Sequence, residues 1–258
     1  MTGRILLVAG VVAGLYLVLG VARLAGAIPG EVWDLLQAPL SDGAQNTITF
    51  TAIVIPIGAL SGFLLGWARV SRHPILAWPA TTYVNVIRGI PPLVMIFFAF
   101  FWLPFVLLPR RETFQVGIAF AILALAAHTS AYQAEIFRAG FQSVPRGQIE
   151  AAEALGLTRW QVMRHVVLPQ AFRVTLPALG NEFANVVKDT TLLAAIGATD
   201  MAYWGRNNVS QAFLNLEWVF TMWIVIAIFY FIITYIITQT VAAIEHRYRV
   251  PGLGSVAF

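Results

Sequence analysis

The sequence predicts an all-α polytopic membrane protein. Of its 258 residues, 59% are hydrophobic and only 11% are charged, and the mean hydropathy is +0.77. Soluble domains carry about 25% charged residues, so this composition excludes a soluble enzyme and a disordered chain. Uncharged runs long enough for a helix of about 20 residues, the length that crosses a bilayer, recur along the chain. The absence of cysteine excludes disulfides, thiolate metal sites and cysteine nucleophiles.

About six spans are expected from the distribution of charge. Five are uncharged runs, and a further span over residues 174–199 is largely apolar but contains charged residues. The first run is longer than the apolar core of about 7–15 residues that a signal peptide has, so we interpret it as a span. Residues 74–87, ahead of the third run, are also uncharged. The five uncharged runs cover residues 5–22, 43–68, 89–109, 113–134 and 218–244.

The distribution of arginine predicts the orientation of these spans. If both termini, the turn at 69–74 and the segment 138–173 are placed in the cytoplasm, eleven of the fifteen arginines lie inside and four lie outside. Cytoplasmic loops of membrane proteins carry such an excess of basic residues. The net charge of +4 therefore indicates topology, and it does not indicate a nucleic-acid partner.

The segment 138–173, which includes residues 145–169, is too charged to cross a membrane and too apolar to be a simple loop. Gly156 permits a reversal of the chain, and Thr158 with Gln161 predicts a capping box that starts a second short helix. Pro169 is expected to end that helix. Two short amphipathic helices with a bend between them suit a groove on a partner protein. A position on the lipid headgroups is an equally weighted alternative.

The same segment resembles the EAA loop of ATP-binding-cassette importer permeases. Glu150, Ala151, Ala152 and Gly156 stand at the spacing of that motif, which continues to Leu168-Pro169 with a valine where isoleucine is usual. Other stretches resemble signatures of the polar amino-acid uptake subfamily, the histidine, glutamine and glutamate type of permease. They are RGIPPL from Arg88, AYQAEIFR from Ala131, LPALGNEF from Leu176 and KDTTL from Lys188.

This resemblance covers residues 44–245 and implies a specific assembly. It implies the type I ABC importer permease (MetI-like) fold in a prokaryotic inner membrane, with Glu150, Ala151, Ala152 and Gly156 as the segment that contacts the ATPase. The implied partners are ATPase subunits that hold ATP and Mg, a second permease chain (the same or a sister chain), an extracytoplasmic binding protein and an amino-acid substrate. The chain has no GxxxxGK[ST] phosphate-binding loop. The sequence also contains no His/Asp/Glu cluster at metal-ligand spacing and no nucleophile–base arrangement, so we expect no catalytic site, cofactor or metal on this chain.

The resemblance also divides the chain. Residues 1–43 are expected to form an extra N-terminal transmembrane helix and an external loop. Residues 44–245 are expected to form the importer transmembrane domain, and residues 246–258 a cytoplasmic C-terminal tail.

Polar residues within the spans are candidates for a substrate path. A zwitterionic amino acid needs an anionic partner for its ammonium group, a role that suits Asp189, and hydrogen-bond donors for its carboxylate, a role that suits Asn185 and Thr190. Thr47 and Thr51 in the second span are further candidates. Packing between helices is the alternative for these residues.

The remaining charges within the spans are interpreted as structural. A charge at the bilayer centre costs about 2.5–3.5 kcal/mol on insertion scales, so Glu182 and Lys188 are expected in structural ion pairs or a hydrogen-bond network between spans. Glu135 and Arg138, three residues apart, are expected to stabilise each other.

An alternative function is a self-contained, ion-coupled secondary transporter that uses Lys188, Asp189 and His128. The small size of the chain, the lack of internal duplication and the segment 145–169 argue against it.

Overall fold

The computed structural model describes residues 20, 23–24, 26, 33–34, 36–37, 39–108, 113–209 and 216–248. These residues are helical almost throughout and include no strand, which confirms the predicted all-α class. The predicted first span, residues 5–22, lies outside the described residues except for residue 20. The predicted C-terminal tail does so from residue 249 onward.

Among the described residues, three helices are long and apolar enough to cross a membrane. Thr113 starts one of them by accepting a hydrogen bond from the amide of Val116 at 3.3 Å, as a helix N-cap does. The three agree with the predicted spans 43–68, 113–134 and 218–244. They are α3 (Ala44–Val70), which follows the π-helical turn η1 (Pro39–Gly43), α6 (Phe114–Gln142) and α11 (Leu216–Tyr248).

Glycines of α3 allow it to lie unusually close to α6. A Cβ at Gly58 would be 2.6 Å from Cγ2 of Thr129, and a Cβ at Gly66 would be 2.8 Å from Cβ of Phe137. Because the contacts follow the same order on both helices, α3 and α6 run parallel. The chain must therefore return across the bundle between them, and α4 and α5 make that return.

The return crossing is broken. α4 (Pro74–Gly89) and α5 (Pro92–Leu107) meet at an angle of 101°. Ile90 between them is extended, with φ −102° and ψ 130°, because a residue that precedes proline is pushed out of the helical region. The prediction of a continuous third span over 89–109 is therefore wrong. The uncharged residues 74–87 supply the first half of this crossing.

The predicted span over 174–199 is an α-helix that turns into a 3₁₀-helix. α9 (Leu168–Asp189) passes into η3 (Thr190–Ile196), which ends at Gly197 with a φ of +87°. Val186 of α9 packs in an apolar cluster with Val54 of α3 and Leu125 of α6. One side of this element therefore packs against α3 and α6, and α9 also contacts α11.

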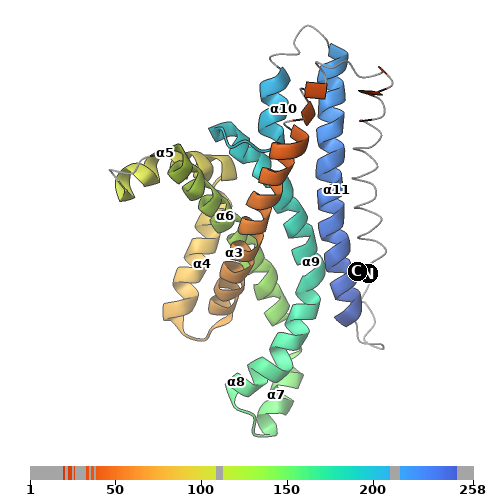
Figure 1. Cartoon of the computed structure of the whole chain (residues 1–258). Helices are drawn as coiled ribbons and strands as arrows, with labels where there is room; N and C mark the ends of the chain where they lie inside the picture. Colours follow the sequence, from red (N-terminus) through yellow and green to blue (C-terminus); the bar gives the residue numbers. More distant parts are fainter. Residues whose placement is uncertain are drawn as a thin grey trace.

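Short helices occupy the two ends of the bundle (Figure 1). α10 (Met201–Val209) lies at one end, and α7 (Arg146–Ala154) with α8 (Arg159–Val162) lies at the other. The start of α10 is fastened by the buried Asp200, which accepts hydrogen bonds from the Tyr230 hydroxyl at 3.0 Å and the Tyr203 amide at 2.7 Å. The π-helical turn η2 (Met163–Val167) joins α8 to α9.

Candidate functional site

The segment 145–169 forms two short helices joined by a tight reversal. Gly156 follows α7 with a φ of +81°, a left-handed conformation that residues with a Cβ avoid. The amide of Leu157 donates to the carbonyl of Ala152 at 3.2 Å, and the amide of Gly156 donates to that of Glu153 at 2.9 Å. These two hydrogen bonds make the Schellman arrangement that closes a helix C-terminus. The chain therefore reverses at the predicted glycine.

α8 begins at the predicted capping box but does not end as predicted. Thr158 Oγ1 accepts a hydrogen bond from the amide of Gln161 at 3.4 Å, and Gln161 Oε1 accepts one from the amide of Thr158 at 2.8 Å. The prediction that Pro169 ends this helix is wrong. The chain continues through η2 into α9, where Pro169 occupies the first turn, a position at which the missing amide proton costs little.

The four residues of the EAA-like pattern face in two directions. Glu150, Ala151 and Gly156 are exposed. Ala152 is only 7% exposed and packs in an apolar cluster with Phe137 of α6. Adjacent residues of a helix do not share a face. Because Ala152 packs against the bundle, Ala151 lies on the outer side of α7. Three of the four residues are therefore accessible to a partner.

Side chains of α3 and α9 attach this segment to the bundle. Trp160 of α8 stacks on Trp67 of α3, with ring centroids 5.9 Å apart and 22° between the ring planes. Gln170 of α9 donates through Nε2 to Oε1 of Gln148 in α7 at 2.7 Å. A displacement of α7 and α8 would therefore be transmitted to both α3 and α9.

The carboxylate of Glu135 lies within 4 Å of three arginine side chains, where α3, α4 and α6 meet. Glu135 forms salt bridges with Arg69 of α3 and Arg138 of α6, and Arg88 of α4 lies 3.8 Å away. Arg88 also lies over the ring of Tyr132, 5.2 Å from its centroid. Sequence spacing pointed to Arg138 as a partner of Glu135, but it did not point to Arg69 or Arg88. The only available signal was that both arginines stand at the ends of uncharged runs.

A row of polar side chains is exposed along α9. Asn181, Asn185 and Lys188, which are spaced by four and then three residues, are all exposed in the single chain, and we call these three residues the polar face of α9. Residues at this spacing lie above one another on a helix. Val174 and Ala178, nearer the start of α9, are exposed as well. They extend the exposed side of the helix beyond the polar face.

Two charged residues of α9 are expected to have structural roles, and one of them has a hydrogen bond to another span. Thr129 of α6 donates a hydrogen bond to Oε1 of Glu182 at 3.0 Å. The salt bridges within the described part of the chain include neither Glu182 nor Lys188, and the structural role expected for these two residues stays a prediction. Asp189 is partly exposed beside the polar face.

The three threonines considered for a substrate path lie inside the chain. Thr47 is fully buried and its hydroxyl accepts a hydrogen bond from the amide of Met201 at 3.3 Å. Thr190 is also fully buried and donates to the carbonyl of Val187 at 2.7 Å. Thr51 is 5% exposed. Their burial favours the alternative interpretation, in which these residues pack helices together.

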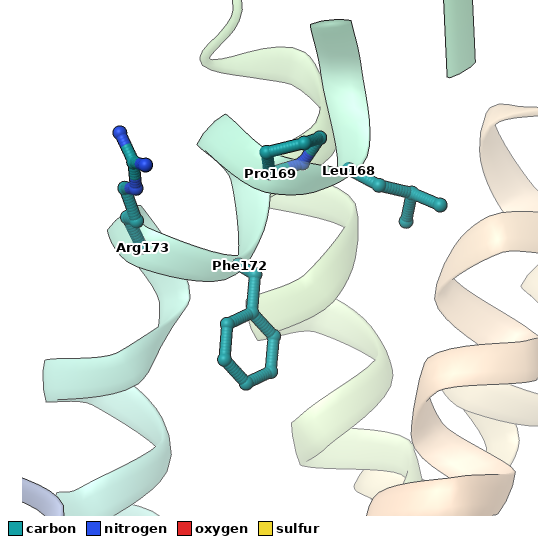
Figure 2. A pocket seen from close by; sticks show the side chains of 4 residues that line it. All are labelled: Leu168, Pro169, Phe172 and Arg173. Atoms are coloured by element: carbon teal, nitrogen blue, oxygen red, sulfur yellow. The ribbon is translucent and has the colours of Figure 1, made fainter. Parts of the chain in front are cut away.

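A shallow pocket of about 360 Å³ lies on the first turns of α9. Figure 2 shows its lining side chains, which are Leu168, Pro169, Phe172 and Arg173. None of them belongs to the polar face of α9. The pocket is therefore a feature of the end of the bundle that carries α7 and α8.

Comparison with known proteins identifies relatives over most of the chain. The probable glutamine ABC transporter permease protein GlnM of Bacillus subtilis (strain 168) is 37% identical over 206 residues, which cover 80% of this chain and 91% of that protein. The glutamine transport system permease protein GlnP of Escherichia coli (strain K12) is 34% identical over 220 residues, 85% of this chain and 96% of that protein.

Solved structures agree with this relationship. A crystal structure of an amino acid ABC transporter with histidines matches with a TM-score of 0.68 and 33% identity, covering 80% of this chain and 92% of that one. The MetNI methionine ABC transporter in an inward-facing conformation shares the fold, with a TM-score of 0.66 at 20% identity over 86% of this chain and 100% of that one. The family model described as the binding-protein-dependent transport system inner membrane component matches residues 47–250, and the chain therefore belongs to this family.

Proposed function

We propose that the chain is the transmembrane permease subunit of an ATP-binding-cassette importer that carries a polar amino acid into the cytoplasm. Its family membership and its amino-acid-transporting relatives support this function. ATP and Mg bind to separate ATPase subunits, which hydrolyse the nucleotide. A binding protein delivers the substrate at the outer surface, and a second permease chain completes the path. No finding favours the ion-coupled alternative.

The observation that carries the proposal is the bent pair α7 and α8 at one end of the bundle (Figure 1). Glu150, Ala151 and Gly156 are exposed there, and a small side chain at position 151 lets a partner backbone approach closely. The ATPase binds this pair in a groove, as amphipathic helices commonly bind. Because Trp160 and Gln148 attach the pair to α3 and α9, movement of the ATPase reaches the spans. The excess of arginine at this end supports a position in the cytoplasm.

The substrate path follows the polar face of α9. Side chains of this polarity are unfavourable against lipid, so Asn181, Asn185 and Lys188 face an aqueous path or a second permease chain. Asp189, beside them, remains a candidate partner for the substrate ammonium group. The buried Thr47, Thr51 and Thr190 are left out of this path.

The test is transport by the reconstituted importer, with the ATPase subunits and binding protein present in proteoliposomes. Gly156→Arg is expected to reduce uptake by at least about tenfold, because a Cβ at a left-handed position costs about 1–2 kcal/mol and the new side chain obstructs the groove. The complex should keep its basal ATP hydrolysis. Gly147→Arg is the matched control, since Gly147 is also exposed in α7 but lacks a positive φ. Wild-type uptake by the Gly156→Arg importer would exclude the coupling role.

A further inference from the structure

Three arginines share a single carboxylate at the place where α3, α4 and α6 meet. Glu135 forms salt bridges with Arg69 and Arg138, and the guanidinium of Arg88 lies 3.8 Å from its Oε2. Each of the three helices contains one arginine and no lysine, and Glu135 is the only acidic residue in any of them. These four residues, which we call the arginine cluster, therefore hold three positive charges against one negative charge.

The carboxylate does not saturate the arginines around it. The Arg69 side chain is only 10% exposed, and its Nε is buried without a hydrogen-bond partner among the described residues. The side chains of Arg88 and Arg138 are 40% and 30% exposed, so they can be reached from outside the chain. Guanidinium groups in such a position match the oxygens of a phosphate, to which they donate paired hydrogen bonds.

The arginine cluster lies close to the boundary between lipid tails and headgroups. α6 has 29 residues and is therefore about 43 Å long, whereas the hydrocarbon core of a bilayer is about 30 Å thick. When α6 is centred in the bilayer, each of its ends projects past this core by roughly 6 Å. Glu135 stands two turns before the end of α6 at Gln142, about 10 Å along the axis. Long arginine side chains at this depth extend to the headgroups.

Apolar side chains of α4 provide a surface for lipid tails beside the arginine cluster. Trp78 is 71% exposed and Val86 is 53% exposed. Because they are eight residues apart, they lie on the same side of the helix. Arg88 follows Val86 by two residues, and its guanidinium lies over the ring of Tyr132, 5.2 Å from the centroid. A lipid along this side of α4 therefore has its tails on apolar residues and its headgroup within reach of Arg88.

We propose that the arginine cluster binds the phosphate of an anionic phospholipid, with Arg88 and Arg138 as the groups that contact it. Basic pockets between membrane helices are a common setting for such headgroups. The charge of the cluster selects the kind of lipid, because a zwitterionic headgroup carries its own cation and brings no net negative charge. This inference goes beyond the proposed function and does not depend on what the chain transports.

The experiment measures thermal unfolding of the detergent-solubilised full chain with one addition at a time. Dioleoyl phosphatidylglycerol is the anionic probe, dioleoyl phosphatidylcholine is the zwitterionic probe, and inorganic phosphate represents the free anion. At about 100 times its dissociation constant, phosphatidylglycerol should raise the midpoint of the wild type by about 5 °C more than phosphatidylcholine does. Arg88→Gln should lose most of this difference. Arg164→Gln, which removes an exposed arginine outside the arginine cluster, should retain it.

Equal midpoints with the two lipids, or an unchanged difference in Arg88→Gln, would overturn the inference. A rise with inorganic phosphate as large as that with phosphatidylglycerol would overturn the assignment to a lipid. Loss of the ATPase subunits or of the second permease chain from the Arg88→Gln complex in size-exclusion chromatography would do the same, because the cluster would then be a protein contact. Mass spectrometry of the phosphatidylglycerol that copurifies with the chain is an independent readout. Its amount should fall in Arg88→Gln, and an unchanged amount would also contradict the proposal.

Discussion

At the scale of single residues, the arginines near Glu135 differ in how deeply they are buried. The Arg69 side chain is only 10% exposed, whereas that of Arg88 is 40% exposed and lies farther from the carboxylate. A guanidinium removed from water needs a counter-charge, and an uncompensated buried charge costs more than an intact pair contributes. Glu135 therefore matters chiefly because it neutralises Arg69, and in doing so it joins α3 to α6.

This inequality predicts the effects of two substitutions. Glu135→Gln should lower the free energy of unfolding of the detergent-solubilised chain by about 2–3 kcal/mol, because the Arg69 charge stays buried without a carboxylate. Arg88→Gln should change it by less than about 1 kcal/mol, as for other solvent-exposed pairs. Denaturant titration followed by circular dichroism measures both. Equal effects of the two substitutions would show that the buried Arg69 charge does not cause the loss in free energy of unfolding.

At the scale of elements, the contact between α3 and α6 depends on the absence of side chains. Lipid tails are as apolar as leucine, so helices in a membrane associate through close packing more than through the hydrophobic effect. Gly58, Gly62 and Gly66 recur every four residues and bring the α3 backbone directly against α6. The contacts follow the same order on both helices, so the pair is parallel, and the chain must cross back between them through α4 and α5.

Gly62→Ala should therefore destabilise the chain although alanine is the better helix former. The new Cβ would lie 2.7 Å from Cβ of Gln133 and 3.0 Å from the Ser130 carbonyl oxygen, and overpacking of this kind costs about 1–3 kcal/mol. Gly89→Ala meets no atom within 4 Å and serves as the matched control. The measurement is the midpoint of thermal unfolding in detergent. A midpoint for Gly62→Ala at or above that of Gly89→Ala would contradict the close contact.

At the scale of the whole molecule, the short helices at the two ends of the bundle differ in arginine content. α10 carries a single arginine, Arg206. The opposite end, formed by α7, α8, η2 and the start of α9, is rich in arginine. Its arginines are Arg146, Arg159, Arg164 and Arg173. The difference predicts that the end with α7 and α8 faces the cytoplasm.

Cysteine labelling tests this orientation directly, because the chain has no native cysteine. Leu155 at the end of α7 is 82% exposed, and Asn207 of α10 is exposed at the other end. Asn207→Cys should react with a membrane-impermeant maleimide on intact cells, whereas Leu155→Cys should react only after the membrane is opened. The reverse pattern would place α7 and α8 outside the cell, out of reach of an ATPase.

Much of the fold could be predicted because its signals are local. An uncharged run reveals a span, the pair Thr158 and Gln161 reveals a helix start, and Gly156 reveals a reversal, since each reflects the chemistry of neighbouring residues. The break between α4 and α5 was missed although Pro91 and Pro92 were visible. In an apolar run, proline does not reveal whether a helix kinks or separates into two.

The sequence by itself predicted an all-α membrane protein, located the three long apolar helices and identified the family that the chain resembles. Only the tertiary structure decided which side chains face a partner and which are enclosed. It buried Thr47, Thr51 and Thr190, brought Arg69 and Arg88 to Glu135, and left Asn185 and Lys188 exposed. The physical reason is that helical spacing defines a face but not its neighbour. The neighbour depends on contacts between helices far apart in the sequence, such as the approach of α3 to α6.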